Sequence, residues 1–299
     1  MDYLFGIILT AVLFASVCQS TDILVGQTGL LSTMAAAFMS IGAYATGIAT
    51  ARLGLPSVYG MILGACLCGT LGSVAALGYS KTERDMFLVA TFALQLALTG
   101  VSFNLSAVTN GAEGITGIAP IAIQSPAISK FVLFMAAISL LFVSSIIYRN
   151  IVRSPLGRVL HAIREDELLA QTLGKNVPFS KLYVLSSSAC VCGAAGSLYA
   201  NYLGYIDPTC FTLNESVMIL SMIIIGGAGS SWGPVVGAAI LICFPEALRT
   251  VGVSGPAAAS IRQILYGTGL IACVVFFPRG IAGVSRKFNL RALSTPPNS

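Results

Sequence analysis

Long apolar runs separated by short polar segments organise this chain of 299 residues. Nine runs can be distinguished, at about 3–19, 33–51, 57–79, 86–103, 130–148, 181–203, 215–227, 233–247 and 262–278. An α-helix needs roughly 20 predominantly apolar residues to cross the hydrocarbon core of a bilayer. The pattern therefore predicts an all-α, polytopic integral membrane protein. We expect one membrane domain over residues 1–299, with about nine transmembrane or partly re-entrant helices.

The seventh and eighth runs are short and flank the glycine-rich segment 226–234. Backbone that is not helical is tolerated at membrane depth only where protein buries it or where it lines a water-filled cavity. These two runs therefore predict either tilted spans or a broken, partly re-entrant pair.

The composition strengthens the membrane interpretation and limits what the charge can mean. Hydrophobic residues make up 56% of the chain and charged residues only 9%, whereas soluble domains carry roughly 25% charged residues. The formal net charge is +5, but the 16 Lys and Arg residues are confined to a few loops and the C-terminal segment. This distribution is typical of a topology signal, and we expect no nucleic-acid partner.

The basic residues also predict the orientation of the spans. Lys81 and Arg84, the segment 149–181 and the segment 279–299 all fall on one side if the runs alternate. That side is expected to be the cytoplasm, which places the N-terminus outside and makes 279–299 a cytoplasmic tail. The loops 104–128 and 204–214 contain no Lys or Arg, as external loops should. The exceptions to the rule are Arg52, Arg249 and Arg262.

The segment 149–180 is the one long stretch that cannot dissolve in lipid, and we call it the insert. Ser154 and Pro155 are typical of a helix start, and Gly174 of the position just past a helix end. Asp166 could cap a second short helix, so one bent helix and two short helices are both open. Apolar residues recur on one face at helical spacing, at Leu156, Val159, Leu160, Ile163, Ala170 and Leu173.

The insert can be interpreted as an amphipathic helix on the membrane surface or as a docking surface for another protein. Its polar face carries mixed charges from Arg164 to Glu167. A helix held on anionic lipid would favour a uniformly basic face, whereas mixed charge suits a protein partner. The residues alone leave these two alternatives open.

Several kinds of chemistry have no support in the sequence. No phosphate-binding loop motif occurs, and His161, the only histidine, lies on the insert without an apparent nucleophile and base. No Asp, Glu, Lys or Arg lies in the central part of a run between residues 30 and 278, which disfavours an ion-coupled carrier. We therefore expect no enzyme activity and no cofactor, and any energy for transport must come from another polypeptide.

Cysteines and small residues are expected to serve packing. Cys66 and Cys68, like Cys190 and Cys192, have two-residue spacing without the ligands of a zinc site, so we expect no metal. Glycine or alanine pairs at i and i+4 allow close approach of helices, and they occur at Gly60/Gly64, Ala65/Gly69 and Gly233/Gly237. Together these pairs predict tight helix packing.

Five motifs in sequence order carry a resemblance to a known family. Residues 157–177 of the insert read GRVLHAIREDELLAQTLGKNV, and further motifs lie at 25–32 with 41–44, at 109–115, at 226–234 and at 278–280. Together they resemble the branched-chain amino-acid permeases of ABC transporters, the LivM-type subunits, over about residues 20 to 282. Members of that family often begin with one further hydrophobic segment, which we do not find here.

The resemblance implies the permease subunit of an ABC importer in a bacterial inner membrane. Its implied partners are a second homologous permease subunit, two cytoplasmic ATPases that use ATP, and an external solute-binding protein. The implied ATPase-coupling residues are Gly157, Arg158, Arg164, Glu165, Asp166, Glu167 and Gly174. Weaker candidates for the translocation path are Gly26, Gly29, Gly111, Gly114, Gly226, Gly227 and Gly229, for which close helix packing is an equally good explanation.

Alternatives remain for the solute and for the class of protein. Urea and short-amide permeases are close variants of the same family pattern. From other classes, a stand-alone channel, an ion-coupled carrier and a membrane scaffold without a transport role remain open.

Overall fold

The structure is a computed structural model that describes residues 2–79, 84–119, 126–250 and 267–268, with side chains described over most of these ranges. The long helices are α1 (Asp2–Asp22), α2 (Ala35–Ala51), α3 (Ser57–Gly78), α4 (Arg84–Asn104), α6 (Pro126–Arg153), α9 (Val177–Leu203), α10 (Leu213–Gly226) and α11 (Gly233–Thr250). Shorter elements are the π-helix η1 (Ile23–Thr28), α5 (Ser106–Thr109), η2 (Gly111–Glu113), α7 (Pro155–Glu165), α8 (Glu167–Thr172) and η3 (Pro208–Phe211). Two short strands, β1 (Ile115–Thr116) and β2 (Tyr205–Ile206), pair antiparallel.

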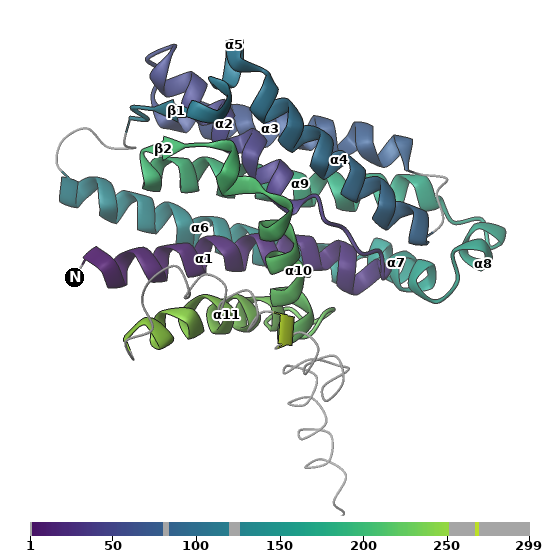
Figure 1. Ribbon diagram of the computed structural model, residues 1–299. Coiled ribbons are helices and arrows are strands. Elements are labelled where there is room, and N and C mark those ends of the chain that lie inside the picture. The colour runs from purple at the N-terminus through teal and green to yellow at the C-terminus, as the bar shows by residue number, and fades with distance from the viewer. Residues whose placement is uncertain (1, 80–83, 120–125, 251–266, 269–299) are drawn as a thin grey trace, which may run out of the picture.

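The long helices form a bundle with two distinct ends (Figure 1). The helices α7 and α8 lie at one end, which we call the insert end, together with the last turn of α3 and the first turn of α4. The N-terminus of α1 and the strands β1 and β2 lie at the opposite end. Helix α9 holds the centre, where it packs against α1, α2, α3 and α6.

The predicted all-α membrane fold is confirmed. Six helical segments within the described residues are long and apolar enough to cross a membrane: 3–28, 57–78, 86–104, 128–153, 177–203 and 208–226. Two shorter apolar helices, Ala35–Ala51 and Gly233–Cys243, correspond to the second and eighth predicted runs. The ninth run, 262–278, lies outside the described residues apart from Gly267 and Thr268.

Two interruptions divide apolar helices of the bundle. After η1 the chain is not helical over residues 29–34, and α2 begins only at Ala35. The second interruption is the segment 227–232 between α10 and α11, and α10 runs at a steep angle to α1 in Figure 1. The short seventh and eighth runs are therefore two separate helices, as both predicted arrangements, tilted spans and a broken, partly re-entrant pair, require.

Close packing at small residues brings α3 against α2 and α9. A Cβ atom added at Gly60 would meet the backbone of Thr46, and one added at Gly193 would meet the Cys68 side chain. Cys68 itself donates a hydrogen bond to the Phe38 carbonyl at 3.2 Å. The tight helix packing predicted from the glycine spacing is thus confirmed, with Cys68 inside a helix interface, whereas Cys66 is exposed.

Apolar side chains also cover much of the outer surface of the bundle. Helices α3, α4 and α6 expose large residues such as Val74, Met86 and Phe142, the last of them by 66%. An exposed apolar surface of this extent is expected of a protein that contacts lipid or further membrane subunits.

Candidate coupling site

The insert folds as two short helices, which settles the alternative that the sequence left open. Ser154 precedes α7 and Pro155 is its first residue, as predicted, although the Ser154 hydroxyl donates to the Ile151 carbonyl and does not cap the helix. Helix α7 ends before Asp166, whose extended backbone separates it from α8. The Asp166 Oδ1 atom accepts hydrogen bonds from the backbone N–H groups of Leu168 and Leu169, at 2.9 and 3.0 Å. Asp166 thereby caps α8.

One face of α7 anchors the insert to the bundle. The Leu160 and Ile163 side chains are fully buried, in agreement with the predicted apolar face. Gly157 packs so closely on the last turn of α6 that a Cβ atom would collide with the Val152 carbonyl. Gly157 is therefore a packing residue, and it sets the angle between α6 and α7.

Helix α8 is held from inside by an ion pair. The Lys181 Nζ atom, on the first turns of α9, lies 2.6 Å from the Glu167 Oε1 atom, and the exposed fractions of the two side chains are 2% and 22%. Gly174 follows α8 with φ at +74°, a conformation that glycine adopts without strain. The predicted end of the insert helix at Gly174 is confirmed.

The outer face of α8 presents three leucines to its surroundings. Leu168, Leu169 and Leu173 are 73%, 58% and 67% exposed. Of the two apolar positions predicted on this face beyond Asp166, Ala170 is buried but Leu173 is exposed, so the placement of Leu173 is wrong. Helix α8 ends at Thr172, so the helical spacing that places Ala170 does not extend to Leu173.

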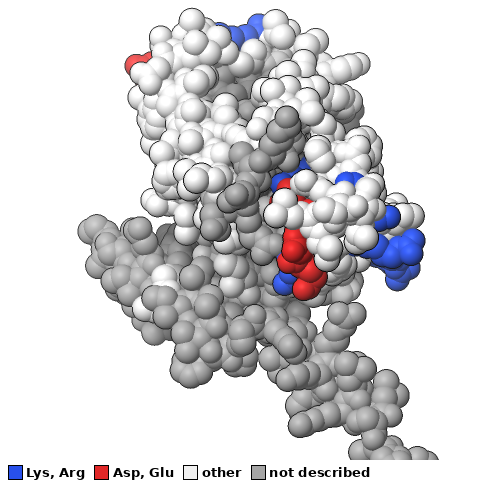
Figure 2. Space-filling view, turned by 90° about the vertical axis from the view of Figure 1, so that its right-hand side faces the viewer, with Lys and Arg blue, Asp and Glu red and all other residues white. Residues whose placement is uncertain are grey.

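The predicted coupling residues therefore have different surroundings. Arg158, Arg164, Glu165 and Asp166 are exposed, whereas Glu167 is paired with Lys181. Acidic and basic atoms gather side by side on the insert in Figure 2, while most of the other described atoms on that face are white. Arg164 reaches toward the bundle, where its Nη1 atom donates to the Gly26 carbonyl at 2.6 Å. The arrangement around Gly26 was not predicted from the sequence.

Asp22 lies at the centre of this arrangement. Its side chain is fully buried, and both of its carboxylate oxygens accept from the Gly229 N–H, at 2.9 and 3.1 Å. The Tyr148 hydroxyl, from α6, donates to the Asp22 Oδ2 atom at 3.2 Å. Arg164 is close enough to interact electrostatically with this carboxylate. Asp22 was not predicted, because it lies just after the first apolar run, 3–19, and before residues 30–278, for which the absence of central charges was noted.

Two buried glutamines extend the same polar contact. Gln27 donates to the Tyr148 hydroxyl at 2.9 Å and to the Gly229 carbonyl at 3.3 Å. Gln19 donates to the Ser231 carbonyl at 2.9 Å, and its own Oε1 atom accepts from Ser144 and Ser145 on α6. The segment 227–232 is thus fastened to α1, η1 and α6 by side chains that lipid could not satisfy.

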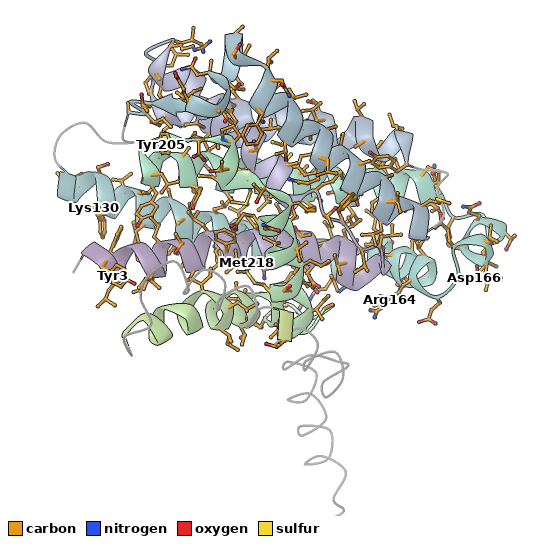
Figure 3. All side chains as sticks on the ribbon, viewed as in Figure 1. Tyr3, Lys130, Arg164, Asp166, Tyr205 and Met218 are labelled. Atoms are coloured by element: carbon orange, nitrogen blue, oxygen red, sulfur yellow. The ribbon has the colours of Figure 1, made fainter. Side chains whose placement is uncertain are left out.

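The glycines proposed for a translocation path do not form one group. Gly26 lies in η1 and Gly29 directly after it, and Gly26 contacts Gly229 of the second interruption. Gly226 is the last residue of α10, and Gly227 is the first residue of that interruption. Gly111 and Gly114 lie with β1, at the end of the bundle where Figure 3 places Tyr205 and far from Arg164. A Cβ atom at Gly26 would collide with the Gly229 N–H, and one at Gly226 with the Gly233 carbonyl. For these two positions close packing is a sufficient explanation.

The end of the bundle opposite the insert is held by a network of its own. Arg52 donates to the Ala107 carbonyl and to the Asn110 Oδ1 atom, both at 2.8 Å, which gives this exception to the charge rule a structural partner. Asp207 accepts from the Tyr205 hydroxyl, the Thr209 hydroxyl and the Cys210 N–H. Burial acts to raise the pKa of Asp207, but these hydrogen bonds outweigh it and leave the pKa below its ordinary value. The hydrogen bond to Asp207 raises the pKa of the Tyr205 phenol.

A third polar cluster joins the start of α2 to the start of α10 inside the bundle. The fully buried Gln95, on α4, accepts from the Ala37 N–H at 2.8 Å and donates to the Phe211 carbonyl at 3.2 Å. Ser216 donates to the Gln95 Oε1 atom and accepts from the Ala36 N–H, both at 3.2 Å. These bonds satisfy N–H groups of the first turn of α2, which have no partner within the helix itself.

The fold and this site define a multi-pass membrane protein whose polar insert is tied to two interrupted helices. The chain belongs to the family of permease components of branched-chain amino acid transport systems, whose family model matches residues 3–274. This membership confirms the resemblance seen in the sequence motifs.

Individual relatives point in the same direction. The chain is 23% identical over 289 residues to the high-affinity branched-chain amino acid transport system permease protein LivM of Salmonella typhimurium, and 24% identical over 295 residues to that of Escherichia coli. Each alignment covers 89% of this chain and 66% of the relative, so the chain spans slightly less than two thirds of their length. The fructose import permease protein FrcC of Rhizobium meliloti is 24% identical over 254 residues, which is 82% of this chain and 71% of the relative. No solved structure matches the chain.

Proposed function

We propose that this chain is the membrane-spanning permease subunit of an ABC importer that carries branched-chain amino acids into a bacterial cell across the inner membrane. It works with a second homologous permease subunit, two cytoplasmic ATPases and an external solute-binding protein. ATP is consumed by the ATPases, and this chain supplies the passage and the mechanical connection. The family match over residues 3–274 carries the proposal.

The outer face of α8 is the proposed docking surface for an ATPase. Leu168, Leu169 and Leu173 provide an exposed apolar surface beside the exposed carboxylates of Glu165 and Asp166. Apolar anchors that become buried at the centre of an interface supply most of its binding energy, while charges around them fix the register. The carboxylates beside the leucines disfavour the alternative of adhesion to anionic lipid.

The two interruptions are the proposed moving parts of the passage. Residues 29–34 and 227–232 are the segments within apolar helices where the backbone can change conformation without breaking helical hydrogen bonds. Gly29 and Gly227 are the first residues of these segments and remain our preferred glycines along the path. Gly111 and Gly114 would contact solute only at the opposite end of the bundle.

The relatives favour an amino-acid solute over urea or a short amide. They also include permeases named for fructose and ribose import, so a sugar is the competing class that an assay must include. Uptake of labelled leucine by vesicles that contain the complete importer tests the solute, with unlabelled leucine, urea, acetamide, fructose and ribose as competitors. Competition by leucine but not by the others supports the proposal, whereas stronger competition by another compound than by leucine reassigns the solute.

Docking is tested by co-purification of the ATPases with the chain. We expect the double substitution Leu168→Ala with Leu169→Ala to lose the ATPases while the chain itself still folds. Leu71→Ala is the matched control, since Leu71 is a leucine 42% exposed on α3, away from the insert. If no ATPase accompanies even the native chain, a stand-alone channel or carrier becomes the better interpretation.

A further inference from the structure

Arg164 makes a contact that a docking role does not require. It lies in the last turn of α7, and its Nη1 atom donates to the Gly26 carbonyl at 2.6 Å. Gly26 lies in the last turn of η1, where carbonyls have no partner further along the helix and carry the negative end of the helix dipole. A guanidinium satisfies such a carbonyl well. The bond therefore joins the insert to the end of the first membrane helix.

Gly26 is in direct contact with the second interruption, the segment 227–232. A Cβ atom at Gly26 would collide with the Gly229 N–H, and one at Gly229 would lie 3.7 Å from the Arg164 Nη1 atom. The Asp22 carboxylate accepts a hydrogen bond from the Gly229 N–H, which joins Asp22 to the same contact. We call Asp22, Gly26, Arg164 and Gly229 the insert junction. It is the point at which α7, η1 and the segment 227–232 meet.

The insert junction contains the ionisable side chains of Asp22 and Arg164, which close packing alone would not require. A fully buried carboxylate is costly within a membrane helix, and such residues are retained mainly where they serve function. The two other buried polar contacts of this region, made by Gln19 and Gln27, use neutral side chains for the same task of holding the segment 227–232. Only the contact that includes Arg164 reaches the insert.

We infer that Arg164 and Asp22 are positioning residues that transmit movement of the insert to the segments 29–34 and 227–232. Arg164 is therefore not a docking contact for the ATPase. A displacement of α7 pulls on Gly26 through Arg164, and on Gly229 through the shared contact with Asp22. The segments 29–34 and 227–232 then move together. This inference rests on the proposed function for the source of the displacement. It divides the insert into a docking face on α8 and, on α7, an Arg164 side chain whose bond to Gly26 transmits the movement.

The first test measures the junction in the purified chain without any partner. Hydrogen exchange should rise about tenfold or more in peptides that cover 23–34 and 226–233 when Arg164 is changed to Gln, because hydrogen bonds to charged groups are stronger than neutral ones. Arg164→Lys keeps the charge without the planar fork and should raise exchange less. His161→Gln, an exposed residue of the same helix, is the matched control and should leave both peptides unchanged.

The second test uses the complete importer and separates transmission from docking. With Arg164→Gln, the ATPases should co-purify at the native level and hydrolyse ATP, while solute uptake falls about tenfold or more, as expected for the loss of about 1.4 kcal/mol of coupling. Asp22→Asn, which retains one acceptor oxygen, should show a smaller loss of uptake.

Two outcomes would overturn the inference without affecting the proposed function. Unchanged exchange in both peptides with Arg164→Gln would show that the junction does not hold these segments. Loss of the ATPases with Arg164→Gln would show that Arg164 is a docking contact after all. In contrast, absence of the ATPases from the native chain would refute the proposed function itself, and with it the source of movement.

Discussion

Lys181 and Glu167 form a salt bridge of 2.6 Å that fastens the outer helix of the insert to α9. The Lys181 side chain is almost entirely buried, at 2% exposure, and so depends on this carboxylate for its charge to be tolerated. Glu167 was expected from the family resemblance to contact an ATPase. Its internal pairing means that any Glu167 variant disturbs the insert itself, whether or not an ATPase also contacts it.

We predict that Lys181→Met and Glu167→Gln each destabilise the protein. Removal of one partner of a fully buried pair costs about 3–5 kcal/mol, and the 22% exposure of Glu167 reduces the expected loss to about 1–3 kcal/mol. The thermal unfolding midpoint of the purified chain in detergent would show the loss. The double variant should be less destabilised than the sum of the two single variants, and simple additivity would argue against the pairing.

A second prediction concerns the contact between Gly26 and Gly229. Gly26→Ala should lower stability markedly, by about 2 kcal/mol or more, because its Cβ atom would overlap with a backbone N–H that cannot move without breaking the bond to Asp22. Gly100→Ala is the matched control, since a Cβ atom there meets nothing within 4 Å. Alanine favours helix over glycine, so this control should be neutral or slightly stabilising. Equal behaviour of the two variants would contradict the contact.

The membrane fold was predictable because it depends on local properties of the chain. Apolar runs of spanning length place most of the helices, and Ser154 with Pro155 and Gly174 marks both ends of the insert. Small residues at Gly60 and Gly64 indicated close packing, which the structure confirms. Each of these signals lies within one short segment and is read from its own periodicity or cap chemistry.

The coupling site was less predictable because its contacts join distant segments. Asp22 bonds to Gly229 across 207 positions, and Arg164 to Gly26 across 138. No local pattern indicates which of these residues meet. The exposure of Leu173 was missed for a different reason, since α8 ends at Thr172 and the helical spacing does not extend to the next residue. A charged residue just beyond an apolar run, such as Asp22, is the signal that would have helped.

A third prediction concerns the buried Gln95. Gln95→Leu leaves the Ala37 N–H and the Phe211 carbonyl without this partner, and each buried group left unsatisfied costs about 1–3 kcal/mol. We therefore expect a lower unfolding midpoint and faster hydrogen exchange in a peptide that covers 33–40. Leu96→Ala, at the exposed neighbouring position on α4, should leave that exchange unchanged. Slow exchange in both variants would show that Gln95 does not hold the start of α2.

The last prediction concerns pH and the end of the bundle opposite the insert. The pKa of Asp207 is lowered in the folded protein, so its ionised form is the one that the fold favours. Its contribution to stability is present above the ordinary pKa of about 3.9 and is lost as the pH falls through the lower, folded value. The raised pKa of Tyr205 gives the opposite sign, a contribution that is present below its ordinary value of about 10 and lost as the pH rises through the folded value.

Asp207→Asn should remove both dependences, because it removes the carboxylate that titrates and the charged acceptor of the Tyr205 hydroxyl. Unfolding midpoints measured from acid to alkaline pH should therefore show a difference between the native chain and Asp207→Asn that is largest near neutrality and shrinks at both extremes. Tyr205→Phe serves as the control, because it removes the whole alkaline component but only part of the acid component, since Thr209 and Cys210 still donate to Asp207. A difference that stays constant across the whole pH range would mean that Asp207 stabilises this turn by shape alone, without a contribution from its charge.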